Sequence, residues 1–199
     1  MASAMGRTES LAYWTVSDHF EEQGRPPRLL HGGFGLLAVG NLRKPRWWGL
    51  WMLEQLLPER LAATITGDGA GDMVQAIASR ADDGRVTIVA WNGTVDVTKA
   101  GGAPMLDRSA SLSLSGLDAR RYRLRHRRLD ATHSNLVARW AELGGTADWP
   151  DEGQWATLAT RDRLEELEPE RIVAPADGKL ELAFELPMPS ISLLELEPA

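Results

Sequence analysis

Residues 11–22 read LAYWTVSDHFEE. The first eight of these residues are apolar and β-prone and end at Ser17-Asp18, which predicts a strand over residues 11–18 with polar groups at its end. An aromatic side chain and several carboxylates at a strand end are typical of the C-terminal rim of a (β/α)8 barrel, where catalytic groups gather from several strands. The stretch therefore favours a barrel strand with a functional site at its end.

A site of this kind suggests Glu21 and Glu22 as the acid and the nucleophile of a glycosidase, but two adjacent glutamates do not suit such a pair. Retaining glycosidases hold two carboxyl groups about 5 Å apart across the sugar bond. Neighbouring residues of an extended chain point to opposite sides, so at most one of Glu21 and Glu22 points into a site. A pair of solvated loop carboxylates is the other interpretation of these residues.

A long loop and an apolar helix are expected after the strand. The loop, residues 19–44, is long enough to suggest a function and contains too many helix breakers for a helix, namely Pro26, Pro27, Gly32, Gly33, Gly35 and Gly40. Pro45 begins a predicted helix that Pro58 limits, and its apolar residues lie nearly all round, so it should be covered on more than one side. One strand and one helix cannot enclose a core, so residues 1–57 are predicted to be the end of a larger structure.

From Leu61 onward the apolar period changes to two, which predicts an antiparallel β region. We expect strands at residues 61–67, 72–80, 85–93, 109–117, 121–129, 179–187 and 190–198. Asp82-Asp83-Gly84 predicts a hairpin between the second and third of these, and helices are expected at 133–143 and 151–167. About seven strands are typical of a β-sandwich. The predicted fold is thus mainly β with some α: a barrel end at 1–57, and a β-sandwich at 60–199 with a helical insertion at about 133–167.

Composition excludes several classes of function. A formal net charge of −6 argues against a nucleic-acid binder, and no apolar run approaches the about 20 residues of a membrane helix. The absence of cysteine excludes disulfides, thiolate nucleophiles and Cys-ligated zinc. His126 and His133 lack the spaced partners of a zinc or iron site, so no metal and no cofactor are expected. The first ten residues lack the apolar core of a secretory signal, which predicts a cytoplasmic protein unless the natural N-terminus is missing.

Two further patterns each allow two interpretations. Residues 120–128 form a basic strand that alone suggests RNA or phosphate, but arginines at alternate positions share one face, and Glu165, Glu166 and Glu168 are available to pair with them. An internally paired or solvated face is the favoured interpretation. The eight tryptophans suit either a core or stacking on sugar rings.

Three segments carry a resemblance to a known family. They read WTVSDHFEE at 14–22, LHGGFGLL at 30–37 and RKPRWW at 43–48. In order and spacing they resemble the last barrel strand, loop and helix of glycoside hydrolase family 39, the family of β-xylosidases and α-L-iduronidases. Softer similarities follow at Trp91-Asn92-Gly93 and in the closing SLLEL of residues 192–196.

The resemblance implies a barrel followed by a β-sandwich and a retaining mechanism with one Glu as acid/base after strand 4 and another as nucleophile after strand 7. Both glutamates would lie upstream of Ser10, where nothing matches their context, so no catalytic residue is assigned in this chain. By position, Trp14 corresponds to the indole floor under the sugar in subsite −1. Glu22, and with it Glu21, corresponds to carboxylates that accept hydrogen bonds from sugar hydroxyls, a task that suits an ionised acceptor.

The loop His31-Gly32-Gly33-Phe34-Gly35 has two interpretations. It is either a substrate loop or a backbone-permissive turn over the barrel mouth whose glycines supply positive φ, and the structural role is favoured.

The predicted function is therefore that of the C-terminal part of a retaining, β-xylosidase-like glycosidase that hydrolyses O-glycosidic bonds of β-xylosides or related glycosides and is inactive alone. Two alternatives remain. One is a non-catalytic carbohydrate-binding or accessory module that uses Trp140, Trp149 or Trp155. The other is a complementing subunit of a split barrel, whose incomplete edge would self-associate. No nucleic acid and no membrane partner is expected.

Overall fold

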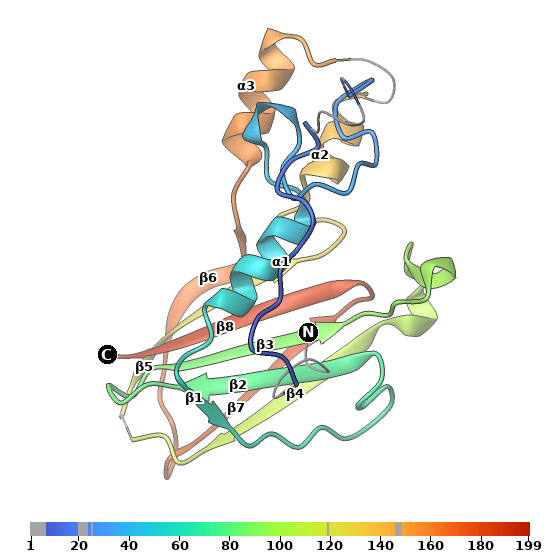
Figure 1. The fold of residues 1–199 in the computed structure, drawn as a ribbon. Coiled ribbons are helices and arrows are strands. Elements are labelled where there is room, and N and C mark those ends of the chain that lie inside the picture. Colours follow the sequence, from blue (N-terminus) through green and yellow to red (C-terminus); the bar gives the residue numbers. More distant parts are fainter. Residues whose placement is uncertain (1–6, 20–23, 25, 119, 146–148) are drawn as a thin grey trace. The chain divides into compact units, whose positions relative to one another are not determined.

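A computed structural model describes the chain except for residues 1–6, 20–23, 25, 119 and 146–148 (Figure 1). The chain divides into two compact units. Residues 1–48 and 134–163 contribute to the first, here called the helical unit, and residues 49–133 and 164–199 form the second, the sheet unit. The boundary at Trp48 and Gly49 falls inside helix α1 (Pro45–Glu54). The linear division at residues 57–60 stays a prediction.

The sheet unit contains two antiparallel sheets. Its strands are β1 (Glu59–Leu61), β2 (Val74–Arg80), β3 (Val86–Asn92), β4 (Arg108–Ser115), β5 (Tyr122–Leu129), β6 (Glu165–Val173), β7 (Lys179–Leu186) and β8 (Ser190–Pro198). The larger sheet has the order β1-β2-β3-β8-β5-β6, and β4 pairs with β7 in the smaller one. Two short 3-10 turns, η4 (Val97–Lys99) and η5 (Pro104–Leu106), lie in the connection from β3 to β4. The prediction of a mainly β fold with antiparallel sheets and some helix is confirmed.

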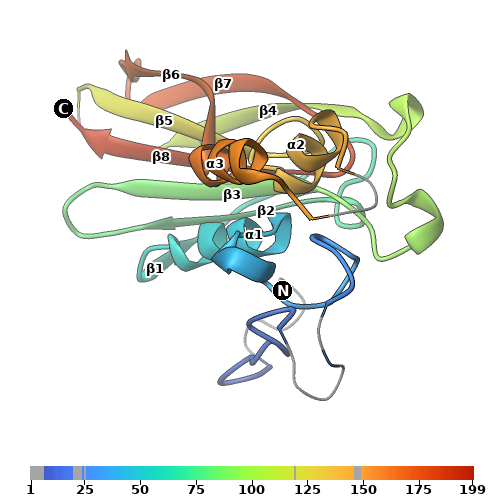
Figure 2. The ribbon, with the colours of Figure 1, turned by 90° about the horizontal axis from the view of Figure 1, so that it is seen from above.

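Both sheets contribute to one apolar core, and Figure 2 shows the strands of the larger sheet side by side from β1 to β6. The alternation of β7 shows why, because Leu180 and Leu182 are buried while Lys179 and Glu181 are exposed. The buried members of this core are Ala78, Val86, Ile88, Tyr122, Leu124, Val173, Leu180, Leu182, Leu194 and Leu196. The predicted hairpin at Asp82-Asp83-Gly84 is confirmed, with Arg80 opposite Val86 and Gly84 at φ 84°.

Two of the predicted elements in the sheet unit differ from the structure. The strand expected at 61–67 is wrong apart from Leu61, the last residue of β1, because Ala62 and Ala63 are exposed and offer little apolar surface to hold an edge strand. The helix expected at 151–167 ends at Arg161, and β6 follows as an edge strand that includes Pro169. Glutamates favour a helix locally, but here they pair with arginines of the neighbouring strand, and this pairing overrides the local preference.

The helical unit packs α2 (Leu136–Glu142) and α3 (Glu152–Arg161) with the loop that precedes α1 and its short 3-10 turn η3 (Val39–Asn41). Its buried core is made by Leu29, Ala38, Leu42, Leu136, Trp140 and Leu158. Asp151 and Gln154 form a capping box that begins α3, with hydrogen bonds of 2.8 and 2.9 Å. Helix α1 begins at Pro45 as expected and ends at Glu54, before the predicted Leu57. Among the residues that the structure describes, every helix is too short or too polar to span a lipid bilayer.

Candidate functional site

The segment predicted as a barrel strand, residues 11–18, forms only a short parallel pairing in the helical unit. One isolated bridge joins Ser17 to Leu37. Three backbone hydrogen bonds support it: the amide of Asp18 donates to the carbonyl of Leu37 (2.8 Å), that of Leu37 to Val16 (2.8 Å), and that of Leu36 to Thr15 (3.1 Å). The strand prediction is therefore wrong over most of its length. Among the described residues, the backbone of this segment pairs with one neighbouring stretch of chain, and it does so only around Leu37.

Asp18 and Lys44 form a buried ion pair at the end of this segment. Lys44 Nζ lies 2.6 Å from Asp18 Oδ1, and the two side chains are 11% and 1% exposed. The same ammonium donates to the carbonyl of Gly33 at 2.7 Å, and the amide of Gly35 donates to Asp18 Oδ1 at 2.9 Å. Charge-assisted hydrogen bonds of this length are the strong ones. The pair thus brings together the Ser-Asp, Gly-Gly-Phe-Gly and Lys-Pro parts of the motif, which are far apart in sequence.

Glycines beside the ion pair are needed because the backbone approaches Asp18 closely. A Cβ on Gly33 would lie 2.5 Å from Asp18 Oδ1, and a Cβ on Gly35 would overlap the Ser17 carbonyl carbon and the Asp18 amide nitrogen. Of the three glycines in residues 31–35, only Gly32 has positive φ, at 90°. The expectation that the loop glycines supply positive φ therefore holds for Gly32 and is wrong for Gly33 and Gly35, where the missing side chain makes room.

Trp14 lies at the surface of the helical unit, with its side chain 69% exposed. Its neighbour Tyr13 is held in place, since the Tyr13 hydroxyl donates to the carbonyl of Phe34 at 2.8 Å and accepts a hydrogen bond from Arg46. The Arg46 guanidinium also lies 5.3 Å from the centre of the Tyr13 ring. Glu21 and Glu22, the other two predicted sugar contacts, lie outside the described residues.

Sequence reasoning missed the roles of Asp18 and Lys44, although both lie inside the motif segments. The signal was present: a carboxylate at a strand end and a lysine directly before the proline that begins α1. Their separation of 26 residues hides the pairing from any local pattern.

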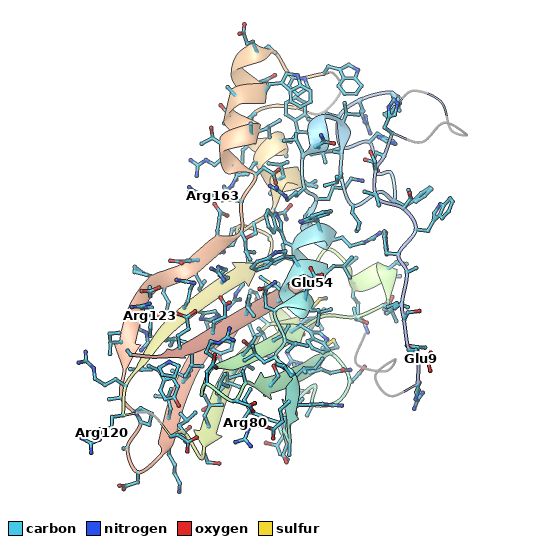
Figure 3. All side chains as sticks on the ribbon, turned by 60° about the vertical axis from the view of Figure 1, so that its left-hand side comes forward. Glu9, Glu54, Arg80, Arg120, Arg123 and Arg163 are labelled. Carbon is cyan, nitrogen blue, oxygen red and sulfur yellow. The ribbon has the colours of Figure 1, made fainter. Side chains whose placement is uncertain are left out.

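The basic face of β5 is internally paired, as predicted. Arg123 lies 3.2 Å from Glu170, and Arg125 lies 2.8 Å from Glu170 and 3.6 Å from Glu166, both of them residues of β6 (Figure 3 labels Arg123). Arg127 pairs with Glu195 of β8. These arginines already have carboxylate partners, so the strand is not arranged to receive phosphate.

A serine, a histidine and a glutamate are aligned inside the sheet unit. His126 Nε2 is 3.0 Å from Ser192 Oγ, and His126 Nδ1 is 3.6 Å from Glu168 Oε1. Ser192 and His126 are almost fully buried, so no substrate can reach the hydroxyl. Burial, and then the charge of Arg128, lower the pKa of His126 to about 4, against the attraction of Glu168. This group is a structural element rather than a hydrolytic centre.

The sequence is similar to glycosidases over most of its length. The family model for glycosyl hydrolases family 39 matches residues 1–176. A β-xylosidase of Geobacillus stearothermophilus is 38% identical over 84 residues, which are 42% of this chain and 15% of that protein. A β-xylosidase of Caldicellulosiruptor saccharolyticus is 27% identical over 156 residues, which are 78% of this chain and 28% of that protein.

Solved structures show the same fold relationship. A GH39 enzyme from Xanthomonas axonopodis pv. citri superposes with a TM-score of 0.79 at 23% identity, covering 98% of this chain and 38% of that one. A monomeric β-xylosidase from Caulobacter crescentus CB15 gives 0.73 at 28% identity, covering 98% and 39%. The chain therefore spans well under half the length of these relatives. Since the family model covers all three motif segments and most of the sheet unit, the chain belongs to glycoside hydrolase family 39.

Proposed function

We propose that this chain is the C-terminal part of a retaining glycoside hydrolase that acts on β-xylosides or related glycosides. In that enzyme residues 1–57 would supply the last barrel strand, loop and helix, with the absent strands extending the pairing that this chain shows only around Ser17 and Leu37. Residues 60–199 would be the accessory β-sandwich with the helical insertion. The supporting observation is the convergence of the three motif segments on the Asp18–Lys44 ion pair, in the same short segment as the surface-exposed Trp14. The acid/base and the nucleophile belong to the part of the barrel that this chain does not supply.

In the proposed enzyme, Trp14 provides the apolar floor of subsite −1, and Glu22 and Glu21 accept hydrogen bonds from sugar hydroxyls. A flat indole face suits a sugar ring because it buries the axial C–H surface while the hydroxyls stay available to polar groups. The exposure of the Trp14 side chain supports this role. The alternative of a separate carbohydrate-binding module through Trp140 is disfavoured, since that indole is 5% exposed in the core of the helical unit.

The sugar contacts are testable in an enzyme completed by the barrel segments of a family 39 relative fused before Arg7. Trp14→Ala and Glu22→Gln are each expected to lower kcat/KM for an aryl β-xyloside by about tenfold, the equivalent of one lost stacking or hydrogen-bonding contact. Steady-state hydrolysis measures the effect. Glu9→Gln, a matched charge removal at an exposed position before the strand segment, should leave kcat/KM unchanged. Wild-type kinetics in Glu22→Gln would show that this residue is not a sugar contact.

The chain on its own is expected to self-associate. Leu11, Trp14 and Val16 are 61%, 69% and 59% exposed on a segment with few backbone partners. Exposed apolar surface of this kind favours association. In size-exclusion chromatography with light scattering, the double variant Leu11→Ser, Val16→Ser should shift the population toward monomer, and Val95→Ser, which changes a fully exposed valine of the sheet unit, should not. A monodisperse wild-type monomer would contradict this expectation.

A further inference from the structure

The ion pair of Asp18 and Lys44 has no counterpart in the proposed chemistry, because both side chains are largely buried and already bonded to each other. We propose that Asp18 and Lys44 are positioning residues, which hold segment 14–18 in place and thereby fix the presentation of the Trp14 indole. The part of this inference that concerns sugar rests on the proposed function. The part that concerns the segment rests on the contacts alone.

Among the described residues, a short backbone pairing holds the segment besides this pair. Its backbone has the three hydrogen bonds to residues 36 and 37, made through Thr15, Val16 and Asp18. The side chain of Asp18 adds two more connections through a single oxygen, one to Lys44 and one to the amide of Gly35. Lys44 in turn holds the carbonyl of Gly33. Loss of the lysine would therefore remove both the link from Asp18 to residue 44 and the link from residue 44 to Gly33.

The Asp18 carboxylate depends on Lys44 to stabilise its charge, because only one of its two oxygens makes hydrogen bonds among the described atoms. Oδ2 is buried and has no hydrogen-bond partner among the described atoms. A buried carboxylate without compensation is strongly unfavourable. With Lys44 neutralised, the Gly35 amide alone would remain to stabilise the charge, so the side chain would move toward water and carry residues 15–18 with it.

An adjacent ion pair offers a matched control. Arg43 NH1 lies 3.3 Å from Asp162 Oδ2, and the Asp162 side chain is 8% exposed. This pair joins the residue next to Lys44 to the end of α3, and the Arg43 guanidinium also lies 5.2 Å from the centre of the Trp48 ring; neither partner belongs to segment 14–18. Arg43→Met therefore removes a cation from a half-buried pair in the same unit without touching the proposed positioning contact.

The experiment uses the full 199-residue chain in the forms wild type, Lys44→Met, Asp18→Asn, Lys44→Arg and Arg43→Met. Amide hydrogen exchange is measured at Asp18, Leu36 and Leu37, with Ile88 of β3 as internal reference. Binding of xylotriose is measured by calorimetry well below the thermal midpoint of each variant. Lys44→Met should raise exchange at the three amides by tenfold or more and weaken xylotriose binding at least fivefold. Lys44→Arg, which keeps the charge, should retain most of the amide protection and most of the xylotriose affinity. Arg43→Met should match the wild type in both measurements.

The outcomes separate the two claims. Unchanged exchange at Leu36 and Leu37 in Lys44→Met would overturn the positioning role, whatever happens to binding. Raised exchange with unchanged xylotriose affinity would also overturn it, since Trp14 would then not depend on the pair. If the wild-type chain binds no xylotriose, the same variants are compared in the enzyme completed by the barrel segments, where raised exchange with unchanged kcat/KM for an aryl β-xyloside would overturn the link between the pair and Trp14. If Lys44→Met does not fold, Asp18→Asn decides, because it removes the charge but keeps an acceptor for Gly35.

Discussion

Replacing Gly35 by alanine is expected to destabilise the helical unit by about 3 kcal/mol, the upper part of the usual range for overpacking a closed site. The added methyl group would overlap the backbone at Ser17 and Asp18, which are bonded to residue 37 by the short parallel pairing. Backbone atoms cannot rotate out of the way as a side chain can. The substitution therefore forces segment 14–18 away from the loop and breaks the contact between Gly35 and Asp18.

Urea unfolding followed by tryptophan fluorescence measures this loss, and amide exchange at Leu37 locates it. Gly153→Ala is the control in the same unit, because Gly153 lies in the first turn of α3, where a methyl group meets only ordinary contact distances. Alanine there should be neutral or stabilise the unit by up to about 1 kcal/mol, in line with helix propensity. A Gly35→Ala chain as stable as wild type would mean that the loop does not lie against Asp18.

Acidification from pH 7 to pH 5 is expected to cost the sheet unit about 2 kcal/mol through His126. Burial and Arg128 lower the pKa of this imidazole from 6.5 to about 4 in the folded chain. The unfolded chain therefore binds more protons between these two values, and stability falls as the pH falls. This stabilising contribution is present above pH 6.5 and is lost progressively as the pH falls to about 4. At that pH the loss amounts to about 3 kcal/mol.

Groups on four strands surround His126. Glu168 of β6 attracts the protonated ring, while Arg128 of β5 and Arg171 of β6 disfavour it. Ser192 of β8 contacts Nε2, and the Phe184 ring of β7 lies edge-on at 4.8 Å. Burial also raises the pKa of Glu195, and a carboxyl with a raised pKa stabilises the fold toward low pH, which opposes the histidine.

Unfolding curves at pH 7, 6 and 5 for wild type and His126→Gln isolate the contribution of the ring. The glutamine variant keeps a polar partner for Ser192 but cannot titrate, so its stability should change far less between pH 7 and 5. Parallel pH profiles for the two chains would show that His126 is not the group responsible.

Sequence reasoning identified the β region and the family because both depend on local patterns. Period-two alternation in residues such as Leu180 and Leu182 marks the inner face of a strand directly. Motif order and spacing were enough to connect segments 14–22, 30–37 and 43–48 with one family, which the match over residues 1–176 confirms.

The remaining features depend on partners that are distant in sequence. Residues 165–167, the start of β6, continue the helical pattern in sequence, but their backbone pairs with β5 and Glu166 pairs with Arg125. The roles of Gly33 and Gly35 depend on where Asp18 lies, which no local rule for glycine contains. The proposed sugar contacts at Glu21 and Glu22 stay predictions, and only Trp14 of the three can be placed on the surface.

The helical unit is assembled from two stretches of chain with the strands from β1 to β5 between them. Trimming the gene at residue 60 would therefore leave Leu136, Trp140 and Leu158 without Leu29, Ala38 and Leu42, the side chains that cover them. Anyone who wants the sheets by themselves must excise residues 134–163 as well and rejoin His133 to Leu164. Because each unit is built from two separate stretches of the chain, neither corresponds to one continuous segment of the sequence.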